Sequence, residues 1–336
     1  MSRAGAPLIV LLLAALTAAC AAPSSGIPQR PSNTVVPHFT DTSFVADDGV
    51  TLPMRAWLPR GEPKAVILAL HGFDDYSHAF EAPAAEWMAR GIATYAYDQR
   101  GFGASPDRGL WPGAQRLTRD AVEASDELHR KYPKAPLYLL GESMGGSVVI
   151  VAAAGAEETP APVVDGIILE APAIWGRSTM NVFERATLWI ADRTMPGLTL
   201  TGPGLGVRAS DNIEMLRALG RDPLVIKATR VDTIKGLVDL MDDALAAGPR
   251  LKTPMLLLYG AHDELIPEGA MQRFVASLPP DEPRRIAYYT AGYHMLLRDL
   301  EGPLVARDVA AWTVNPETAL PSHADLHGEG ALAAAH

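Results

Sequence analysis

The sequence predicts an α/β fold with a mostly parallel central sheet, helices on both faces and a helical cap inserted into the chain. Three observations support this prediction. The continuous apolar run at residues 65–70 is typical of a strand buried on both faces of a parallel sheet, and residues 92–97 form the next predicted strand. Segments with helical spacing of apolar residues alternate with these runs, which favours parallel pairing. Residues 173–250 lack a strong strand pattern, and a gap of that length indicates an insertion with its own helices.

The remaining elements can be assigned in chain order. Asp47-Asp48-Gly49 separates the extended segments 43–46 and 50–58, and Asp-Gly at such a position predicts a hairpin. The apolar residues of segment 80–89 recur at helical spacing, and Gly91 ends that pattern. Further helices are predicted at 117–128, 147–156 and 303–312, and further strands at 137–140, 164–169, 255–259 and 285–289.

Length and composition indicate a globular protein with one large core. The chain has 336 residues, of which 48% are hydrophobic and 20% charged. Its formal net charge of −10 argues against a nucleic-acid partner. The predicted division is a signal peptide at 1–19, a flexible tether at 20–38, a core at 39–172 and 251–314, a helical cap at 173–250 and a disordered tail at 315–336.

The first twenty residues have the pattern of an export signal. Arg3 precedes an apolar run at 7–19 that is too short to span a bilayer as a helix. The run ends in Leu-Thr-Ala-Ala-Cys, which resembles the lipobox of bacterial lipoproteins, although Thr17 stands where that pattern prefers leucine. Cys20 is the only cysteine, so the chain can form no internal disulfide and no cysteine-based metal site. We expect export to the cell envelope with Cys20 lipidated as a membrane anchor; the alternative is secretion after cleavage near Ala19 or Ala22.

A serine between glycines is the most informative motif. Gly141-Glu142-Ser143-Met144-Gly145 follows a predicted strand and precedes a predicted helix. A strand, a very tight turn and a helix hold such a serine in strained backbone geometry, which projects its hydroxyl from the sheet edge. The pattern therefore predicts that Ser143 is a nucleophile, and the alternative is a serine that only forms a turn.

A serine nucleophile needs a base and a carboxylate that orients the base. Asp263 follows the strand at 255–259, and His294 follows the strand at 285–289, so both are expected at the same sheet edge as Ser143. Glu264 is the leading substitute for the acid, and His262 could compete as the base, although the chain order serine, acid, histidine disfavours it.

The reaction also needs donors for the developing oxyanion. We expect one to be the main-chain N–H of Met144, directly after the nucleophile. The other is predicted to be the N–H of Phe73, because Gly72 after the strand at 65–70 lets the backbone approach a substrate closely. His71 is interpreted as a structural residue of the turn.

These motifs, together with Asp98-Gln99-Arg100-Gly101-Phe102-Gly103-Ala104-Ser105, resemble the monoacylglycerol lipase and lysophospholipase branch of the α/β-hydrolases, also classed with serine aminopeptidase-like hydrolases. The resemblance covers residues 44–312. It implies a cap domain where the insertion is predicted, and neither a metal nor an organic cofactor.

The expected activity is hydrolysis of carboxylic esters with an acyl chain, such as monoacylglycerols or lysophospholipids, through an acyl-enzyme. The Met, Phe, Trp and Leu residues of the cap favour an acyl chain, but they could equally form the cap's own small core. Two alternatives stay open: a peptidase or amidase with the same triad, and an envelope lipoprotein that binds a partner without catalysis. The sequence leaves the oligomeric state open.

Overall fold

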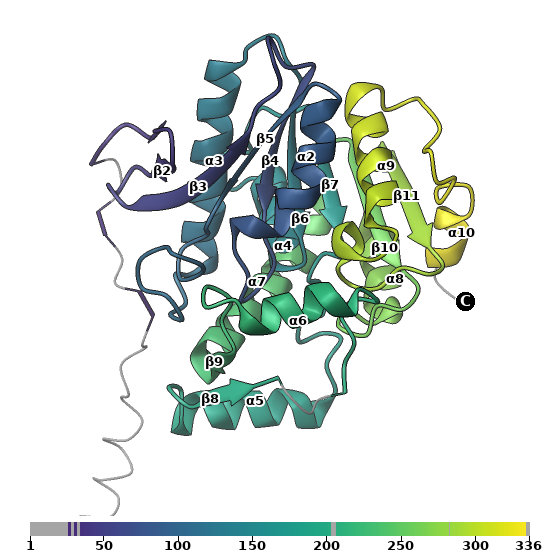
Figure 1. Ribbon diagram of the computed structural model, residues 1–336. Helices are drawn as coiled ribbons and strands as arrows, with labels where there is room; N and C mark the ends of the chain where they lie inside the picture. The colour runs from purple at the N-terminus through teal and green to yellow at the C-terminus, as the bar shows by residue number, and fades with distance from the viewer. Residues whose placement is uncertain (1–25, 28–29, 32–33, 203–205, 282, 334–336) are drawn as a thin grey trace, which may run out of the picture.

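The computed structural model describes residues 26–27, 30–31, 34–202, 206–281 and 283–333 (Figure 1). The predicted signal peptide at 1–19, Cys20 and part of the tether lie outside these residues, as do 334–336 of the tail. Within the described part of the chain, no helix is both long enough and apolar enough to cross a membrane.

The central sheet contains nine strands in the described chain, in the order β1-β2-β3-β5-β4-β6-β7-β10-β11. β3 pairs antiparallel with β5, whereas all pairings from β5 to β11 are parallel, which confirms the predicted fold class. The predicted strands at 65–70 and 92–97 have the observed bounds, and the others differ by one or two residues at an end. The strands span His38–Phe39 (β1), Ser43–Val45 (β2), Thr51–Trp57 (β3), Ala65–Leu70 (β4), Ile92–Tyr97 (β5), Leu137–Glu142 (β6), Gly166–Glu170 (β7), Met255–Gly260 (β10) and Arg284–Tyr289 (β11).

Helices cover both faces of the sheet, because alternate side chains of each buried strand point to opposite faces. On one face Leu68 and Leu139 join a core with α3, α4, α7 and α8. On the other face Ile67 and Leu140 join a core with α2 and α9. These helices span Glu81–Ala89 (α2), Ala114–Lys131 (α3), Met144–Ala154 (α4), Val231–Ala247 (α7), Glu268–Ser277 (α8) and Gly302–Val314 (α9), and short helices occur at Ser77–Phe80 (η1), Gly248–Arg250 (η2), Leu296–Arg298 (η3) and Gly328–Leu332 (α10).

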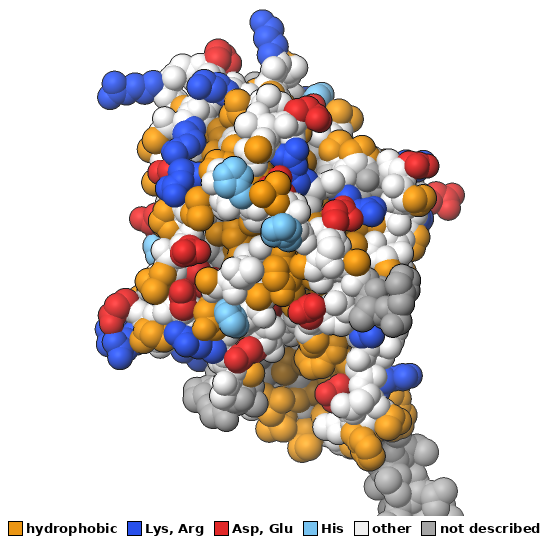
Figure 2. All heavy atoms as spheres, turned by 90° about the vertical axis from the view of Figure 1, so that its right-hand side faces the viewer, with side chains coloured by type: hydrophobic (Ala, Val, Ile, Leu, Met, Phe, Trp, Pro, Cys, Tyr) orange, Lys and Arg blue, Asp and Glu red, His pale blue; other side chains and the backbone are white. Residues whose placement is uncertain are grey.

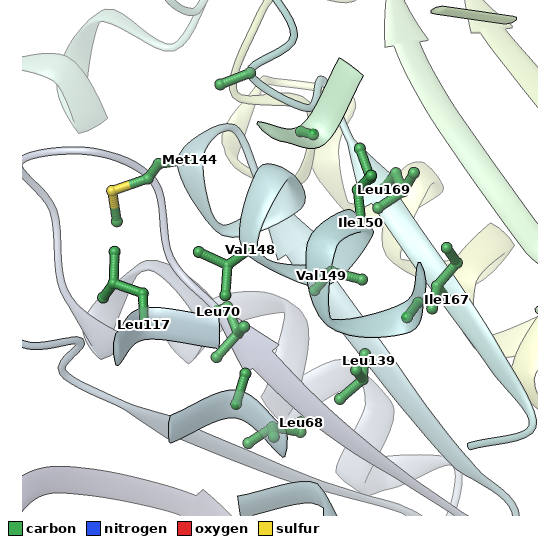
Figure 3. Packing of buried hydrophobic residues seen from close by; sticks show 14 of the residues in the cluster. Leu68, Leu70, Leu117, Leu139, Met144, Val148, Val149, Ile150, Ile167 and Leu169 are labelled. Atoms are coloured by element: carbon green, nitrogen blue, oxygen red, sulfur yellow. The ribbon is translucent and has the colours of Figure 1, made fainter. Parts of the chain in front are cut away.

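α4 is the central helix of the larger core. Val148, Val149 and Ile150 are all fully buried, as expected for a helix that is apolar on every side. Figure 3 shows these side chains packed beside residues of β4, β6 and β7. The residue before α4 is Ser143, so the packing of this helix fixes the position of the predicted nucleophile.

The cap lies below the carboxyl edge of the parallel strands in Figure 1 and is not purely helical. It contains α5 (Val182–Thr194), β8 (Thr199–Thr201), α6 (Ile213–Arg221) and β9 (Ala228–Arg230), and β8 pairs antiparallel with β9. The prediction that 173–250 is all cap is wrong for α7. This helix buries Leu240 and Ala244 in the core beside α4, because it is the crossover helix between β7 and β10.

The prediction of a disordered tail is wrong for residues 315–333. Leu320 and Leu332 are fully buried, and each joins one of the two cores. The main-chain N–H of Tyr288 in β11 donates to the carbonyl of Ala324 at 3.0 Å. Packing of a few apolar side chains against distant elements therefore orders a segment that has no periodic pattern of its own.

Part of the predicted tether is also attached to the core. The N–H groups of Thr34 and Val35 both donate to the carbonyl of Asp47, at 2.7 and 2.9 Å. The tether prediction therefore fails for these residues, which lie against the hairpin between β2 and β3.

Candidate active site

Ser143 occupies the turn between β6 and α4. Its φ of 52° and ψ of −113° are unusual for a residue with a side chain, and such strain costs about 1–3 kcal/mol. Hydrogen bonds hold the turn: the N–H of Ser143 donates to the carbonyl of Glu170 at 2.9 Å, and its carbonyl accepts from the N–H of Ala173 at 2.9 Å. The side chain stays partly exposed, as a nucleophile requires.

The glycines of the motif are required by close backbone approach. A Cβ atom on Gly145 would lie 2.0 Å from the carbonyl oxygen of Leu70, and one on Gly141 would lie 2.3 Å from the carbonyl oxygen of Gly145. Any side chain at these two positions would displace α4 from β4 and β6. The spacing of the motif therefore follows from the packing around the turn.

Asp263 and His294 meet at the same sheet edge. His294 Nδ1 lies 2.9 Å from Asp263 Oδ2, and the side chain of Asp263 is completely buried. The second carboxylate oxygen, Oδ1, accepts hydrogen bonds from the N–H groups of Leu265 and Ile266 at 2.8 and 2.9 Å. These two bonds fix the carboxylate so that Oδ2 faces the imidazole.

The two substitutes considered from the sequence lie elsewhere. Glu264 is exposed, and its carboxylate accepts a hydrogen bond from the N–H of Arg208 at 2.7 Å. His262 is exposed and its ring lies beside that of Tyr293. The geometry therefore favours Asp263 and His294 over both alternatives.

The charge of Asp263 raises the pKa of His294. Burial lowers the pKa of the imidazole, but the carboxylate and its hydrogen bond raise it, and the net pKa lies above the ordinary value of 6.5. An imidazole whose protonated form is stabilised in this way can accept a proton from a serine and return it to a leaving group.

Glu170 brings the loop of His294 close to Ser143, although β7 and β10 lie between β6 and β11 in the sheet. Its carbonyl accepts the N–H of Ser143, and its side-chain Oε1 accepts the N–H of Leu297 at 2.9 Å. The loop after β11 therefore crosses the sheet edge and ends beside the serine turn. Burial and the neighbouring Glu142 raise the pKa of Glu170 well above its usual range.

The predicted oxyanion donors flank the serine. A Cβ atom on Gly72 would lie 3.4 Å from the Cβ of Ser143, so the loop that carries Phe73 passes directly beside it. Met144 is the first residue of α4, where main-chain N–H groups point out of the helix end.

His71 holds this loop through hydrogen bonds of its ring, which agrees with its interpretation as a structural residue. Its Nδ1 lies 2.8 Å from the carbonyl of Gly72, and its Nε2 accepts the N–H of Gln99 at 2.9 Å. Because burial also lowers the pKa of His71, the ring is neutral and serves as a support for the turn.

The cap is attached to both sides of the site. The N–H of Met295, next to His294, donates to the carbonyl of Ala209 at 3.0 Å. On the other side, the N–H of Ile226 donates to the carbonyl of Asp74 at 2.9 Å, one residue after Phe73. The cap is therefore hydrogen-bonded to the loop of His294 and to the loop of Phe73.

Sequence reasoning did not find the buried charges beneath the site. Asp75, Glu142 and Arg298 form ion pairs there, and Glu170 lies among them. Glu142 stands inside the serine motif, but nothing in the sequence signals that it pairs with an arginine more than 150 residues away. Across the described residues, no cluster of three or more His, Cys, Asp or Glu side chains could hold a metal ion.

A strained serine at a strand–helix turn, a buried Asp–His pair and a cap over the sheet edge together define a hydrolase of the α/β-hydrolase superfamily. Residues 61–301 match the family described as serine aminopeptidase, S33, and the chain belongs to that family. It is a carboxylic ester hydrolase of the branch that resembles monoacylglycerol lipases.

The alignments with known relatives cover most of this chain and most of each relative. Monoglyceride lipase from Homo sapiens is 28% identical over 281 residues, which are 83% of this chain and 90% of the relative. Monoacylglycerol lipase from Mycolicibacterium smegmatis is 25% identical over 82% of this chain and 97% of its own length. A soluble variant of monoglyceride lipase from Saccharomyces cerevisiae has the same fold, with a TM-score of 0.67 at 18% identity over 87% of this chain and 99% of that one.

Proposed function

We propose that the protein is an exported serine hydrolase that cleaves esters of acyl chains, of the monoacylglycerol or lysophospholipid type. The observation that carries this proposal is the buried Asp263–His294 pair, held at the sheet edge where Ser143 stands at the start of α4. The names of the relatives, which include a monoglyceride lipase and a phospholipase, support the substrate class.

In the proposed mechanism Ser143 Oγ attacks the ester carbonyl while His294 Nε2 accepts the serine proton. Asp263 keeps the ring proton on Nδ1 and stabilises the imidazolium that forms. The N–H groups of Phe73 and Met144 bind the oxyanion, and each such donor contributes roughly 2.7–4 kcal/mol. His294 then protonates the leaving alcohol, and a water molecule that it activates hydrolyses the acyl-enzyme.

The surface of the cap supports an acyl chain as part of the substrate. Phe183 and Trp189 on α5 are 80% and 58% exposed, and Leu200 on β8 is 50% exposed. Figure 2 shows hydrophobic side chains gathered at the lower end of the molecule, where Figure 1 places these elements. A cavity of about 490 Å³ beside α5 is lined by Phe183, Leu200 and Ile234, among others, which suits a hydrocarbon chain.

The test starts with Ser143→Ala. This variant should lose the turnover of p-nitrophenyl esters, and retained activity would overturn the assignment of the nucleophile. A fluorophosphonate probe should label the wild-type serine, whereas an unlabelled wild-type protein would favour a binding lipoprotein without catalysis. A panel of short and long acyl chains, each as monoacylglycerol and lysophospholipid, then identifies the substrate.

Peptide or amide hydrolysis by the same triad is a second candidate activity beside ester hydrolysis, because the matched family is described as serine aminopeptidase. Matched substrates that differ only in the scissile bond, a p-nitrophenyl ester and a p-nitroanilide, separate the two functions. We expect much faster turnover of the ester, and faster turnover of the anilide would favour the peptidase.

Export and lipidation form part of the proposal and rest on residues 1–20 of the sequence. Metabolic labelling with a radioactive fatty acid should modify the wild-type protein and not Cys20→Ala. Fractionation should find the wild-type protein with the membrane, and Cys20→Ala released from it. Labelling that survives the substitution would contradict lipidation at Cys20.

A further inference from the structure

Arg298 lies four residues after His294, in η3, and is buried beneath the candidate site. Its side chain is only 8% exposed, and it pairs with two carboxylates that come from distant segments. Nη1 donates to Asp75 Oδ2 at 2.7 Å, and Nη2 donates to Glu142 Oε1 at 2.5 Å. One guanidinium therefore joins three segments of the chain.

Each of the three segments carries a part of the proposed chemistry. Glu142 directly precedes Ser143 in the serine turn. Asp75 is two residues after Phe73, and its own loop is tightened by a hydrogen bond from the N–H of Tyr76 to Oδ1 at 2.9 Å. Arg298 itself belongs to the loop of His294.

The planar fork of an arginine suits this role, because it can bond two carboxylates in fixed directions at once. A buried ion pair is weak evidence for stability, since desolvation of the charges offsets much of their attraction. Stability alone therefore does not account for an arginine that pairs with two carboxylates directly beneath the site.

We infer that Arg298 is a positioning residue for the reaction: its guanidinium holds the histidine loop, the serine turn and the oxyanion loop in one fixed arrangement. The inference rests on the proposed function of Ser143 and His294. It assigns no contact with substrate to Arg298, which acts through the groups that the three loops carry.

The charges around His294 give this role a measurable signature. Burial lowers the pKa of His294, Asp263 in the loop after β10 raises it, Glu142 at the end of β6 raises it further, and Arg298 lowers it. Loss of the arginine charge should therefore raise the pKa of His294, whereas loss of the Glu142 charge should lower it. A buried charge remote from His294 would produce neither effect.

The test measures kcat, KM and the pH profile of kcat/KM for full-length variants with one ester substrate. In Arg298→Gln we expect kcat to fall by up to about 100-fold with little change in KM, as for small misplacements of reacting groups. The acid limb of the profile should move to higher pH. In Glu142→Gln the acid limb should move to lower pH, which is the opposite direction.

Arg298→Lys keeps the charge but loses the fork. Its acid limb should stay close to that of the wild type, while kcat still falls because one ammonium cannot hold both carboxylates in the same directions. This variant therefore separates the effect of charge from the effect of geometry.

Arg116→Gln is the matched control. Arg116 is also 8% exposed, and it pairs with Asp47 and Asp120 in a cluster between α3 and the hairpin after β2; neither of these carboxylates belongs to the three loops. It should lower the melting temperature without moving the acid limb.

If Arg298→Gln behaves like Arg116→Gln, with lower stability but unchanged kcat and acid limb, the inference is overturned. If Arg298→Gln does not fold, Glu142→Gln decides: an acid limb that stays in place or moves to higher pH overturns the inference. The proposed function fails separately, when Ser143→Ala stays active or the wild type hydrolyses no ester.

Discussion

Asp263→Asn exchanges one oxygen of a buried carboxylate for an amide nitrogen and leaves the size of the side chain nearly unchanged. In the wild type, Oδ1 accepts two main-chain hydrogen bonds, at 2.8 and 2.9 Å, and Oδ2 faces His294. Because those two N–H groups require an oxygen, the new amide nitrogen must turn toward the imidazole. It then donates to Nδ1 and forces the ring proton onto Nε2, the atom that must accept the proton of Ser143.

The expected loss is large because two contributions act together. The wrong tautomer prevents general-base catalysis, and the charge that stabilises the imidazolium is gone. We expect kcat to fall about 10⁴-fold, which is roughly 5.5 kcal/mol at about 1.36 kcal/mol per factor of ten. The melting temperature should change little, because the amide oxygen keeps the two main-chain hydrogen bonds of the carboxylate.

Steady-state kinetics with a p-nitrophenyl ester measure this loss, with Glu264→Gln as the control. The control removes the neighbouring exposed carboxylate and should keep nearly full activity. If Asp263→Asn retains activity within tenfold of the wild type while Glu264→Gln loses it, the acid is Glu264 and the reasoning from burial is refuted.

Three further predictions follow from the geometry. The pKa of His294 is raised above 6.5, and the protonated ring cannot act as a base. On acidification kcat/KM should therefore fall with a midpoint above pH 6.5. A midpoint below pH 6.5 would contradict the raised pKa. Gly145→Ala places a methyl group 2.0 Å from the carbonyl oxygen of Leu70 and should destabilise the protein by about 3 kcal/mol or more, measured by denaturant unfolding. The control Gly220→Ala, in a helix with open space around it, should instead stabilise by about 0.5–1 kcal/mol, and equal effects of the two changes would refute the packing argument. Phe183→Ser should lower kcat/KM about tenfold for esters of long acyl chains but not for esters of short ones. The reason is that burial of part of a phenyl ring against the chain contributes roughly 1.5 kcal/mol. Equal losses for both kinds of ester would show that α5 does not bind the acyl chain.

The fold class could be predicted from the sequence because its strands are buried on both faces. Segment 65–70 is apolar throughout, and segment 92–97 lies between Gly91 and Asp98, so even their bounds agree with the structure. The predicted site residues follow from chain order, because the loops after parallel strands meet at one edge. That reasoning needs no knowledge of distant contacts.

Other features depend on contacts that a local pattern cannot contain. α7 looks like part of the insertion in the sequence, and only its packing on α4 assigns it to the core. The pairing of Glu142 with Arg298 joins residues that are remote in the chain, and neither residue has a local signal for it. Burial of Leu320 and Leu332 likewise depends on surfaces formed by other elements.

The segment after α9 covers the last strand of the central sheet. β11 is the last strand of the sheet, and an open edge strand offers unpaired main-chain groups to a strand of another molecule. Residues 320–332 lie along that edge: Ala324 accepts from Tyr288, and Gly328 packs so closely on Ile286 that a Cβ would lie 1.9 Å from its carbonyl oxygen. The opposite edge ends in β1, which has only two residues. A chain truncated after α9 would retain every proposed catalytic residue but would expose the unpaired main-chain groups of β11. We therefore expect such a truncated chain to self-associate.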